Sequence, residues 1–351
     1  MHSIEHVPAQ KMREFIERCL ARLGLPRRDA GAVAELMTEA DLQGADGHGI
    51  FRLPQYVRRI QAGAVNVRPN IHLERERSAM ALVHGDNGMG HLVMKFAAHT
   101  AIAKARTAGS AWVGVKMSNH AGPASLYAKM AMREDMIGLY LAVGNANHLP
   151  PWGGLEMLLS TNPIAVAIPG GDEPPIVLDM APTVAAYGKV KVRAQRGEMM
   201  PEGWMVDREG RPLTDPRRMA EGLLLPIGGY KGYGLALVFG LLAGTLNGAA
   251  MGRAVVDFNA DDSSVTNTGH AIVALDISAF DEVDAFKARV DDIARQMRSA
   301  ERMKGVERIW LPGEQSQAKH AQRLRDGVPL APALRRALDE LAAELGVESL
   351  G

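Results

Sequence analysis

The sequence contains a single cysteine, Cys19, among its 351 residues. One thiol can neither close a disulfide within the chain nor build a cysteine-based zinc site. Basic and acidic residues number 40 each, so no positive excess favours nucleic acid or an anionic membrane as a partner. The amino terminus lacks the basic start and the apolar run of a signal peptide. These absences favour a reducing compartment, and we expect a cytoplasmic protein.

Standard catalytic motifs and membrane-spanning runs are also scarce. Neither G-x-G-x-x-G nor G-x-x-x-x-G-K-[ST] occurs, which excludes a standard Rossmann or P-loop site. H-E-x-x-H and G-x-S-x-G are absent, so we expect no metal centre and no serine hydrolase. The longest uncharged apolar stretch, residues 234–252, is rich in glycine and alanine. It predicts a buried helix of a globular core rather than a membrane span.

The spacing of apolar residues predicts helices at both ends of the chain and an α/β region between them. Residues 12–23 place apolar side chains, Cys19 included, on one helical face, and residues 334–345 repeat that pattern. Asp29 is predicted to cap a second helix. Helices are also expected at 91–108 and 281–305, and strands at 79–83, 111–115, 137–143, 164–168, 176–178 and 271–275. We expect the terminal helices to pack into one layer beside the α/β part.

A histidine between two glycines, Gly47-His48-Gly49, is the first candidate for chemistry. An imidazole titrates near neutral pH and can move a proton. Arg52 follows four residues later, and a guanidinium can hold a carboxylate through two parallel hydrogen bonds. The residues alone equally fit an exposed loop histidine beside a solvated arginine.

Three further polar segments adjoin apolar ones. Asn119-His120 follows the strand predicted at 111–115, and Asp179 follows the strand predicted at 176–178. Loops after strands commonly carry function in α/β proteins. The glycine-rich segment 228–234 opens a helix and contains Lys231, a combination that suits an anion. Helix caps and tight turns are the alternative interpretations of these segments.

Taken together, the motifs resemble the malate/L-lactate dehydrogenase-type family of NAD(P)-dependent oxidoreductases. Its relatives include ureidoglycolate dehydrogenase, sulfolactate dehydrogenase, diketogulonate reductase and the Δ1-piperideine-2-carboxylate reductases. The resemblance runs from the first helix to about residue 316, and it rests on the order and spacing of short motifs. They are Gly47-His48-Gly49-Ile50 with Arg52, Asn119-His120-x-Gly122, Thr161-Asn162-Pro163, Leu178-Asp179-Met180-Ala181, Gly188-Lys189, Gly229–Gly234, Gly269-His270 and Pro312-Gly313-Glu314.

The resemblance implies an α/β, non-Rossmann NAD(P)-binding fold with a mixed sheet and a helical layer from both chain ends. It also implies an intimate homodimer. Residues 1–75 with 300–351 are expected to form the helical layer and to serve in dimerisation. Residues 76–138 with 222–299 are expected to form an α/β substrate domain, and 139–221 the NAD(P)-binding domain.

By the same resemblance, His48 is expected to transfer the proton, with His120 completing the site, and the two roles are interchangeable. Arg52 is expected to hold the substrate carboxylate. The residues themselves add one expectation: a carboxylate at the end of a strand can orient an imidazole, and we expect Asp179 to do so. The resemblance implies NAD or NADP as the cofactor. Its contacts are expected from His120, Asn145, Asn162, Asp179, Met180, Ala181, Lys231, Gly232, Gly313 and Glu314.

The implied reaction interconverts a small 2-hydroxy acid, of the malate or lactate kind, and its 2-oxo acid. Many members of the family carry serine before the first histidine, whereas this sequence has Gly47, which leaves the exact substrate open. A cyclic imino acid reductase with the same cofactor and histidines is the alternative enzyme. A non-catalytic nucleotide-binding protein is the alternative from another class.

Overall fold

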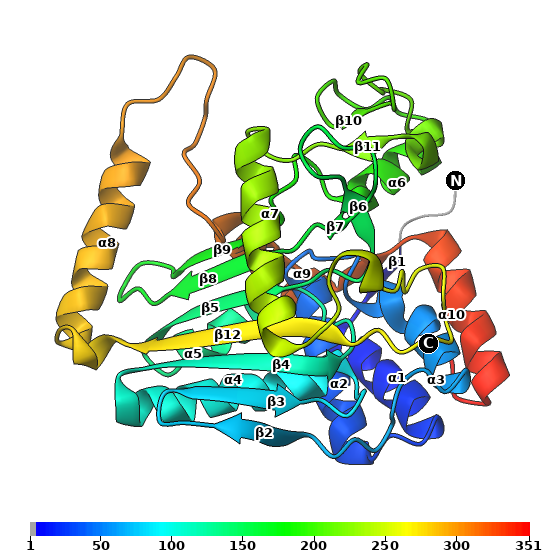
Figure 1. The fold of residues 1–351 in the computed structure, drawn as a ribbon, viewed down its shortest axis with the longest axis horizontal. Coiled ribbons are helices and arrows are strands. Elements are labelled where there is room, and N and C mark those ends of the chain that lie inside the picture. Colours follow the sequence, from blue (N-terminus) through cyan, green and yellow to red (C-terminus); the bar gives the residue numbers. More distant parts are fainter. Residues whose placement is uncertain (1–4) are drawn as a thin grey trace.

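The computed structural model describes residues 5–351, apart from the side chains of residues 191, 192, 195 and 196. Its centre is a seven-stranded sheet with the order β2-β3-β4-β12-β5-β8-β9 (Figure 1). β3 and β4 pair in parallel, and all other neighbours in this sheet are antiparallel. The strands are β2 (His72–Glu76), β3 (Met80–His84), β4 (Ser110–Ser118), β5 (Met136–Ala142), β8 (Ile164–Ile168), β9 (Ile176–Met180) and β12 (Thr268–Asp276). The mixed sheet implied by the sequence is therefore confirmed.

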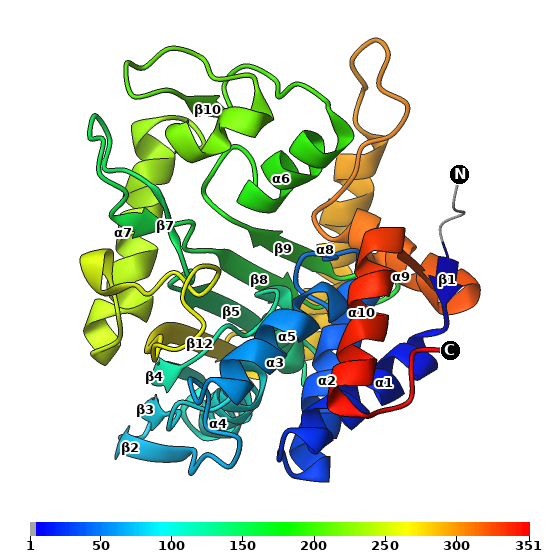
Figure 2. The same cartoon turned by 90° about the vertical axis from the view of Figure 1, so that its right-hand side faces the viewer.

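Helices cover the two faces of this sheet unequally. α4 (Gly90–Ala108) and α5 (Ser125–Met132) pack on one face, where alanine and valine side chains of the strands fill the core. α7 (Tyr230–Ala243) lies alone against the other face (Figures 1 and 2). The other helices and strands of the chain's middle are β6 (Asn147–Leu149), β7 (Leu159–Ser160), α6 (Tyr187–Arg196), β10 (Met205–Val206), β11 (Leu223–Leu224) and α8 (Val283–Ser299).

Both chain ends meet in one helical layer, as the sequence predicted. Its helices are α1 (Ala9–Arg22), α2 (Arg27–Leu42), α3 (Leu53–Gln61), α9 (Glu314–Asp326) and α10 (Pro332–Leu345). Phe15 and Cys19 of α1 share a core with Leu338 and Leu341 of α10. Burial raises the pKa of the Cys19 thiol to about 12, so this side chain serves packing. The ladder between β1 (Glu5–Val7) and β13 (Val328–Leu330) joins the two ends (Figure 2).

Two local expectations are wrong. Asp29 does not cap α2: the helix begins at Arg27 after Pro26, so Asp29 already lies in its first turn. The glycine-rich helix is not buried, because it rests on the sheet with one side only and ends at Ala243. Its outward side chains Leu235, Val238 and Leu241 are 41%, 50% and 43% exposed. Nevertheless, none of the helices between residues 5 and 351 combines the length and the apolar character needed to cross a membrane.

Candidate active site

A buried aspartate shapes the turn that presents His48. Oδ2 of Asp41, in α2, accepts a hydrogen bond of 2.7 Å from the backbone N–H of Ile50. Burial raises the pKa of the Asp41 carboxyl to about 8. The backbone of Gly49 passes so close to this carboxyl that a Cβ at position 49 would lie 2.1 Å from it. The glycine after His48 is therefore required by packing, whereas a Cβ at Gly47 would meet nothing within 4 Å.

Gly49→Ala is expected to destabilise the protein by about 1–3 kcal/mol, the usual range for overpacking a core. The added methyl group collides with the Asp41 carboxyl, which Ile50 holds in place. Gly47→Ala is the matched control and should leave stability within about 0.5 kcal/mol of the wild type. Urea denaturation of both variants measures the difference. Equal midpoints for the two would show that the Gly49 backbone has room to move.

His120 lies in the loop after β4, in a stack of three rings. Its imidazole centroid is 5.4 Å from that of His48 and 5.0 Å from that of the Phe258 ring. Nδ1 of His120 lies 2.5 Å from the hydroxyl oxygen of Tyr56, and the Gly122 N–H donates to the same nitrogen at 3.4 Å. When Nδ1 carries the ring hydrogen and donates it to the Tyr56 oxygen, in place of the long Gly122 contact, Nε2 is left to accept a proton. The structure thus brings the two predicted histidines together.

Arg52 stands beside this stack with neutral partners only. Its guanidinium donates to the carbonyl of Gly47 at 2.8 Å, to Oε1 of Gln55 at 2.8 Å and to Oδ1 of Asn259 at 3.1 Å. It also lies 5.1 Å from the centroid of the Phe258 ring. No carboxylate of the described residues neutralises Arg52, so its charge is available to an acidic ligand beside His120.

Burial keeps several imidazoles of this region neutral. It lowers the pKa of His48 to about 4, with a further contribution from the charge of Arg52. Burial also lowers the pKa of His91 to about 3 and that of His270 to about 4. The pKa of His120 is held well below its ordinary value by burial and by the neighbouring charges. At neutral pH, the histidines of this group are therefore uncharged, which is the form that has a lone pair for a proton.

These shifts predict that the protein loses stability in acid between about pH 6.5 and pH 4. The unfolded chain binds protons at His48, His91 and His270 below about pH 6.5, while the folded protein does not until about pH 3–4. Each group costs about 1.4 kcal/mol per pH unit in that window. Asp41 acts in the opposite direction, because the folded protein keeps its carboxyl proton up to about pH 8, but it is a single group.

Calorimetric melting at several pH values tests this expectation. His91→Phe should flatten the acid slope, whereas His99→Gln, at an exposed position on α4, should leave it unchanged. A slope that His91→Phe does not alter would show that His91 gains protons equally in both states.

Asp179, at the end of β9, is not brought to either histidine. Its Oδ2 accepts a hydrogen bond of 2.9 Å from the N–H of Ser125 at the start of α5. Among the described residues, neither His48 nor His120 is a hydrogen-bond partner of this carboxylate. Tyr56 holds the imidazole instead, while Asp179 ties β9 to the start of α5, the helix that follows the His120 loop.

Segments expected to contact the cofactor converge around β9 and the first turn of α7. The carbonyl of Pro182 accepts from the N–H of Ile227 at 3.1 Å, and a Cβ at Gly232 would lie 2.8 Å from the same oxygen. A Cβ at Gly313 would lie 2.9 Å from Cβ of Val177 in β9. Met180 and Ala181 lie in the sequence between Val177 and Pro182, the residues that make these two contacts. Lys231 is exposed. The beginning of α7 thus places a lysine and glycines beside β9, which suits a phosphate-bearing ligand. The N–H groups of Lys231, Gly232 and Tyr233 already donate to carbonyls of residues 227–229, so the contact rests on the lysine and on the close approach that glycine allows.

Three other expected cofactor residues are engaged within the protein. Asn162 is fully buried, and its amide accepts from the N–H of Gly144 and donates to the carbonyl of Ala236. Asn145 donates to Thr268, and its carbonyl accepts from the N–H of Phe258. Glu314 binds Arg298 and the N–H of Leu311. Although burial raises the pKa of Glu314, these partners bring it below its ordinary value. In the structure these side chains brace the site.

Comparison with known proteins agrees with this geometry. A family model described as malate/L-lactate dehydrogenase matches residues 7–339. The chain belongs to this family. As a member of the malate/L-lactate dehydrogenase family, it is an oxidoreductase that acts on hydroxy acids.

Relatives and solved structures match over almost the whole chain. Malate dehydrogenase of Pyrococcus horikoshii is 38% identical, with 98% of this chain and 96% of that protein covered. Ureidoglycolate dehydrogenase (NAD(+)) of Escherichia coli is 32% identical, with 92% of each covered. The structure of sulfolactate dehydrogenase from Methanocaldococcus jannaschii superposes with a TM-score of 0.92 at 35% identity, covering 98% of each chain. The predicted family is confirmed.

Residue-by-residue reasoning on this member of the family missed Tyr56, Phe258 and His91. Tyr56 lies on a helix, α3, that the sequence analysis did not predict. Phe258 lies in a loop held by Gln55, which donates to its carbonyl. His91 is fully buried, stands edge-on to Tyr56 and has no hydrogen-bond partner among the described residues. The i, i+4 spacing of Arg52 and Tyr56 was the one available signal.

Proposed function

We propose that this protein is an NAD(P)-dependent dehydrogenase of a small 2-hydroxy acid, equivalently a reductase of its 2-oxo acid. The observation that carries the proposal is a guanidinium without a carboxylate partner, that of Arg52, near an imidazole that a hydrogen bond to Tyr56 holds in place, that of His120. Arg52 has only neutral partners, and it stands beside the ring stack of His48, His120 and Phe258. A 2-hydroxy acid carries a carboxylate next to a hydroxyl, which is the pair of groups that these side chains bind.

Arg52 fixes the substrate through its carboxylate. Nε and Nη1 already donate to Gly47, Gln55 and Asn259, so a two-nitrogen contact with the carboxylate uses Nη2 together with the Nη1 hydrogen that Asn259 accepts at 3.1 Å and must release. Such a contact sets both the position and the plane of the carboxylate, so the neighbouring C2 has a defined direction. Positioning of this kind contributes several kcal/mol to lowering a barrier, because it is established before the reaction begins. The contacts from Gly47 and Gln55 hold the guanidinium rigidly for this purpose.

His120 is the proton-transferring group in this proposal, and His48 packs on its ring. During oxidation, Nε2 of His120 takes the hydroxyl proton as the C–H bond at C2 breaks. During reduction, the same nitrogen returns a proton to the oxygen. Tyr56 can donate to Nδ1 or accept from it, so it orients the ring in both protonation states. The hydrogen bond from Tyr56 favours His120 over His48 for this role.

A bound nicotinamide cofactor supplies the acceptor or donor of the hydride. The protein's own groups for holding it are the segment 179–183, the first turn of α7 with Lys231, and Gly313. Asn162 donates to Ala236 in the middle of α7, and Glu314, which adjoins Gly313, accepts from Arg298, so both stabilise the elements that carry these groups. Asn145 donates to Thr268 of β12. The ureidoglycolate dehydrogenase relative is an NAD(+) enzyme by name, which favours NAD. The division into substrate and cofactor domains and the cytoplasmic location stay predictions.

A reduction assay tests the proposed function. Purified protein is mixed with NADH or NADPH and a panel of pyruvate, oxaloacetate, sulfopyruvate and cyclic imines, and cofactor absorbance is followed. We expect turnover on an oxo acid. Turnover on the imines alone would support the alternative enzyme, an imino acid reductase. If none of these substrates is turned over although the protein binds the cofactor, the proposed substrate class is wrong.

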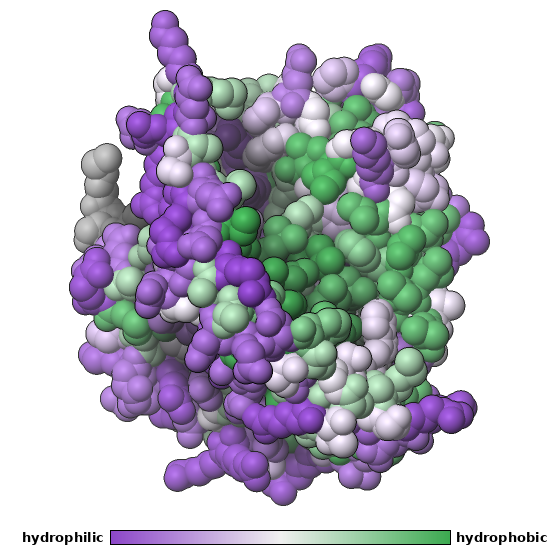
Figure 3. Space-filling model, turned by 90° about the vertical axis from the view of Figure 1, so that its left-hand side faces the viewer, coloured by the Kyte–Doolittle hydropathy of each residue, from purple (hydrophilic) through white to green (hydrophobic). Residues whose placement is uncertain are grey.

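We further propose that the enzyme acts as a homodimer that joins through α7 and the open face of the sheet. Figure 3 shows hydrophobic side chains gathered over a broad area of this side of the molecule. Leu235, Val238 and Leu241 of α7 are each about half exposed, and Ile293 and Met297 of α8 are 49% exposed. A helix that is apolar all round requires cover on both sides. The helical layer has a filled core of its own.

Light scattering tests the dimer. The wild type should have twice the mass of the 37.8 kDa chain. Val238→Asp places a charge in the proposed interface and should shift the protein toward single chains. Val306→Asp, at an exposed position that is 37% accessible in the loop after α8, is the control. A dimer that tolerates Val238→Asp would contradict this interface.

A further inference from the structure

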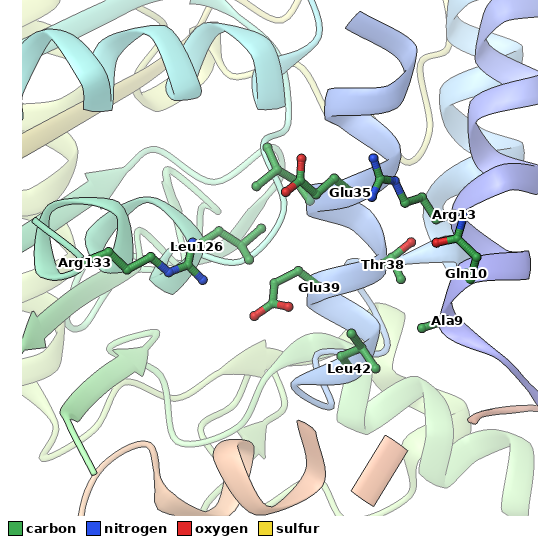
Figure 4. A pocket seen from close by; sticks show the side chains of 10 residues that line it. Ala9, Gln10, Arg13, Glu35, Thr38, Glu39, Leu42, Leu126 and Arg133 are labelled. Atoms are coloured by element: carbon green, nitrogen blue, oxygen red, sulfur yellow. The ribbon is translucent and has the colours of Figure 1, made fainter. Parts of the chain in front are cut away.

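A cavity of about 220 Å³ lies between α1, α2 and α5, outside the group formed by His48, His120 and Arg52 (Figure 4). Apolar side chains of Leu36, Leu42 and Leu126 line part of it. The hydroxyl of Thr38, also in its wall, is buried and has no hydrogen-bond partner among the described residues. A buried hydroxyl without a partner is unusual and suggests that a ligand or water supplies one.

The charged groups of the cavity leave a positive excess. Arg13 of α1 and Arg133, directly after α5, are exposed residues that line its open side from opposite directions (Figure 4). Within residues 5–351 as described, neither guanidinium has a hydrogen-bond or ion-pair partner. Glu39 is already matched by Lys129 at 3.3 Å and His320 at 3.0 Å, which leaves Glu35 as the single unpaired carboxylate. Two free guanidinium groups against one free carboxylate favour an anionic ligand.

We infer that this cavity is an effector site for a small carboxylate carried on a short apolar chain. The carboxylate binds between Arg13 and Arg133, and the chain packs on the leucine side chains. The volume suits a ligand of a few carbon atoms rather than a nucleotide. Glu35 at the rim adds a place for an ammonium group, so a branched amino acid and its deaminated analogue share the chemistry required.

A chain of hydrogen bonds links the cavity wall to the proposed cofactor site, and the effector role therefore rests on the proposed function. Oε1 of Glu39 accepts from Gln43 at 2.7 Å. Oε1 of Gln43 lies 3.5 Å from Oγ of Ser125, whose N–H donates to Asp179. A ligand that shifts α2 against α5 changes this chain at Gln43. Cofactor affinity and ligand affinity are then coupled, and the coupling is reciprocal.

Calorimetric titration of the full-length Arg52→Met variant with 4-methylpentanoate tests the site. Loss of Arg52 removes carboxylate binding at the candidate active site, so the remaining heat reports the cavity. We expect one ligand per chain. Adding Arg133→Met should weaken binding at least tenfold, and 3-methylbutylamine, which lacks the carboxylate, should not bind. Arg336→Met, an exposed arginine of α10 that does not line the cavity, is the matched control. L-leucine binding tighter than 4-methylpentanoate would assign Glu35 to the ammonium group.

Absence of carboxylate binding, or binding that Arg133→Met leaves unchanged, would overturn the site. The effector role has its own readout: the Kd for NADH, measured by fluorescence in Arg52→Met, should change at least threefold with saturating 4-methylpentanoate. Gln43→Met should abolish that change while the carboxylate still binds. A Kd for NADH that is the same with and without 4-methylpentanoate would overturn the effector role. Failure of NADH to bind at all would count against the proposed function, and the titration would still decide the cavity.

Discussion

His120→Ala is expected to lower kcat by about 10²–10⁴-fold in both reaction directions, the range for losing a general acid–base group. The ring is the point where Tyr56, Gly122, His48 and Phe258 converge, and its free Nε2 is the atom that exchanges the proton. Alanine removes only one of the expected cofactor contacts, the imidazole of His120. The Kd for NADH should therefore change much less than kcat does. Steady-state kinetics with fluorescence titration separates the two effects.

Tyr56→Phe is the matched control for this experiment. It keeps the ring of Tyr56 against His91 but removes the hydroxyl that holds Nδ1 of His120. A smaller fall in kcat than in His120→Ala, with an altered pH profile, is the result that an orienting role predicts. Near-normal turnover of His120→Ala, with activity lost in His48→Ala, would exchange the roles of the two histidines.

Arg52→Lys is expected to lower kcat/KM for carboxylate substrates by about 10- to 100-fold. An ammonium keeps the positive charge but cannot form two parallel hydrogen bonds, and a hydrogen bond to a charged group is worth about 1.5–3 kcal/mol. The loss should appear mainly as a higher KM, because the interaction exists in the bound substrate as well as in the transition state.

Arg58→Lys, on α3, which begins directly after Arg52, is the control. Arg58 is exposed and pairs with Asp262 at 3.0 Å, so its replacement should leave the kinetic constants near those of the wild type. An unchanged KM in Arg52→Lys would place Arg52 outside the substrate site. The neutral partners of its guanidinium would then need another explanation.

Local apolar patterns were sufficient to predict the main strands and the terminal helices. The strand expected at 164–168 is β8 with the same bounds, and the last helix differs from α10 by two residues at its start. Short amphipathic segments were missed: α3 and α5 have nine and eight residues, too few for a clear period. The exposed side of α7 was also missed, because composition alone does not tell which face of a helix meets a partner.

In the site, too, the sequence predicted the residues that stand in short local motifs and missed those that only tertiary contacts bring together. His48, Arg52 and His120 were found because each stands in a short motif. Tyr56 and Phe258 were not predicted as site residues, because both are at least 64 positions away from His120 in the sequence. Phe258 also lies in a loop that has no recognisable sequence pattern. Asp179 was expected beside an imidazole because it follows a predicted strand, but its carboxylate accepts a hydrogen bond from Ser125 instead. Contacts of this kind depend on tertiary structure, which sequence spacing does not report.

Transfer of a label from the cofactor tests the central claim most directly. The protein is incubated with a 2-oxo acid, pyruvate or oxaloacetate, and with NADH deuterated in turn on each face of C4, and the product is examined by mass spectrometry and NMR. The account predicts a 2-hydroxy acid that carries one deuterium at C2, from one of the two labelled cofactors only. A product without deuterium at C2 from either cofactor, or the absence of any hydroxy acid while cyclic imines are reduced, would contradict it.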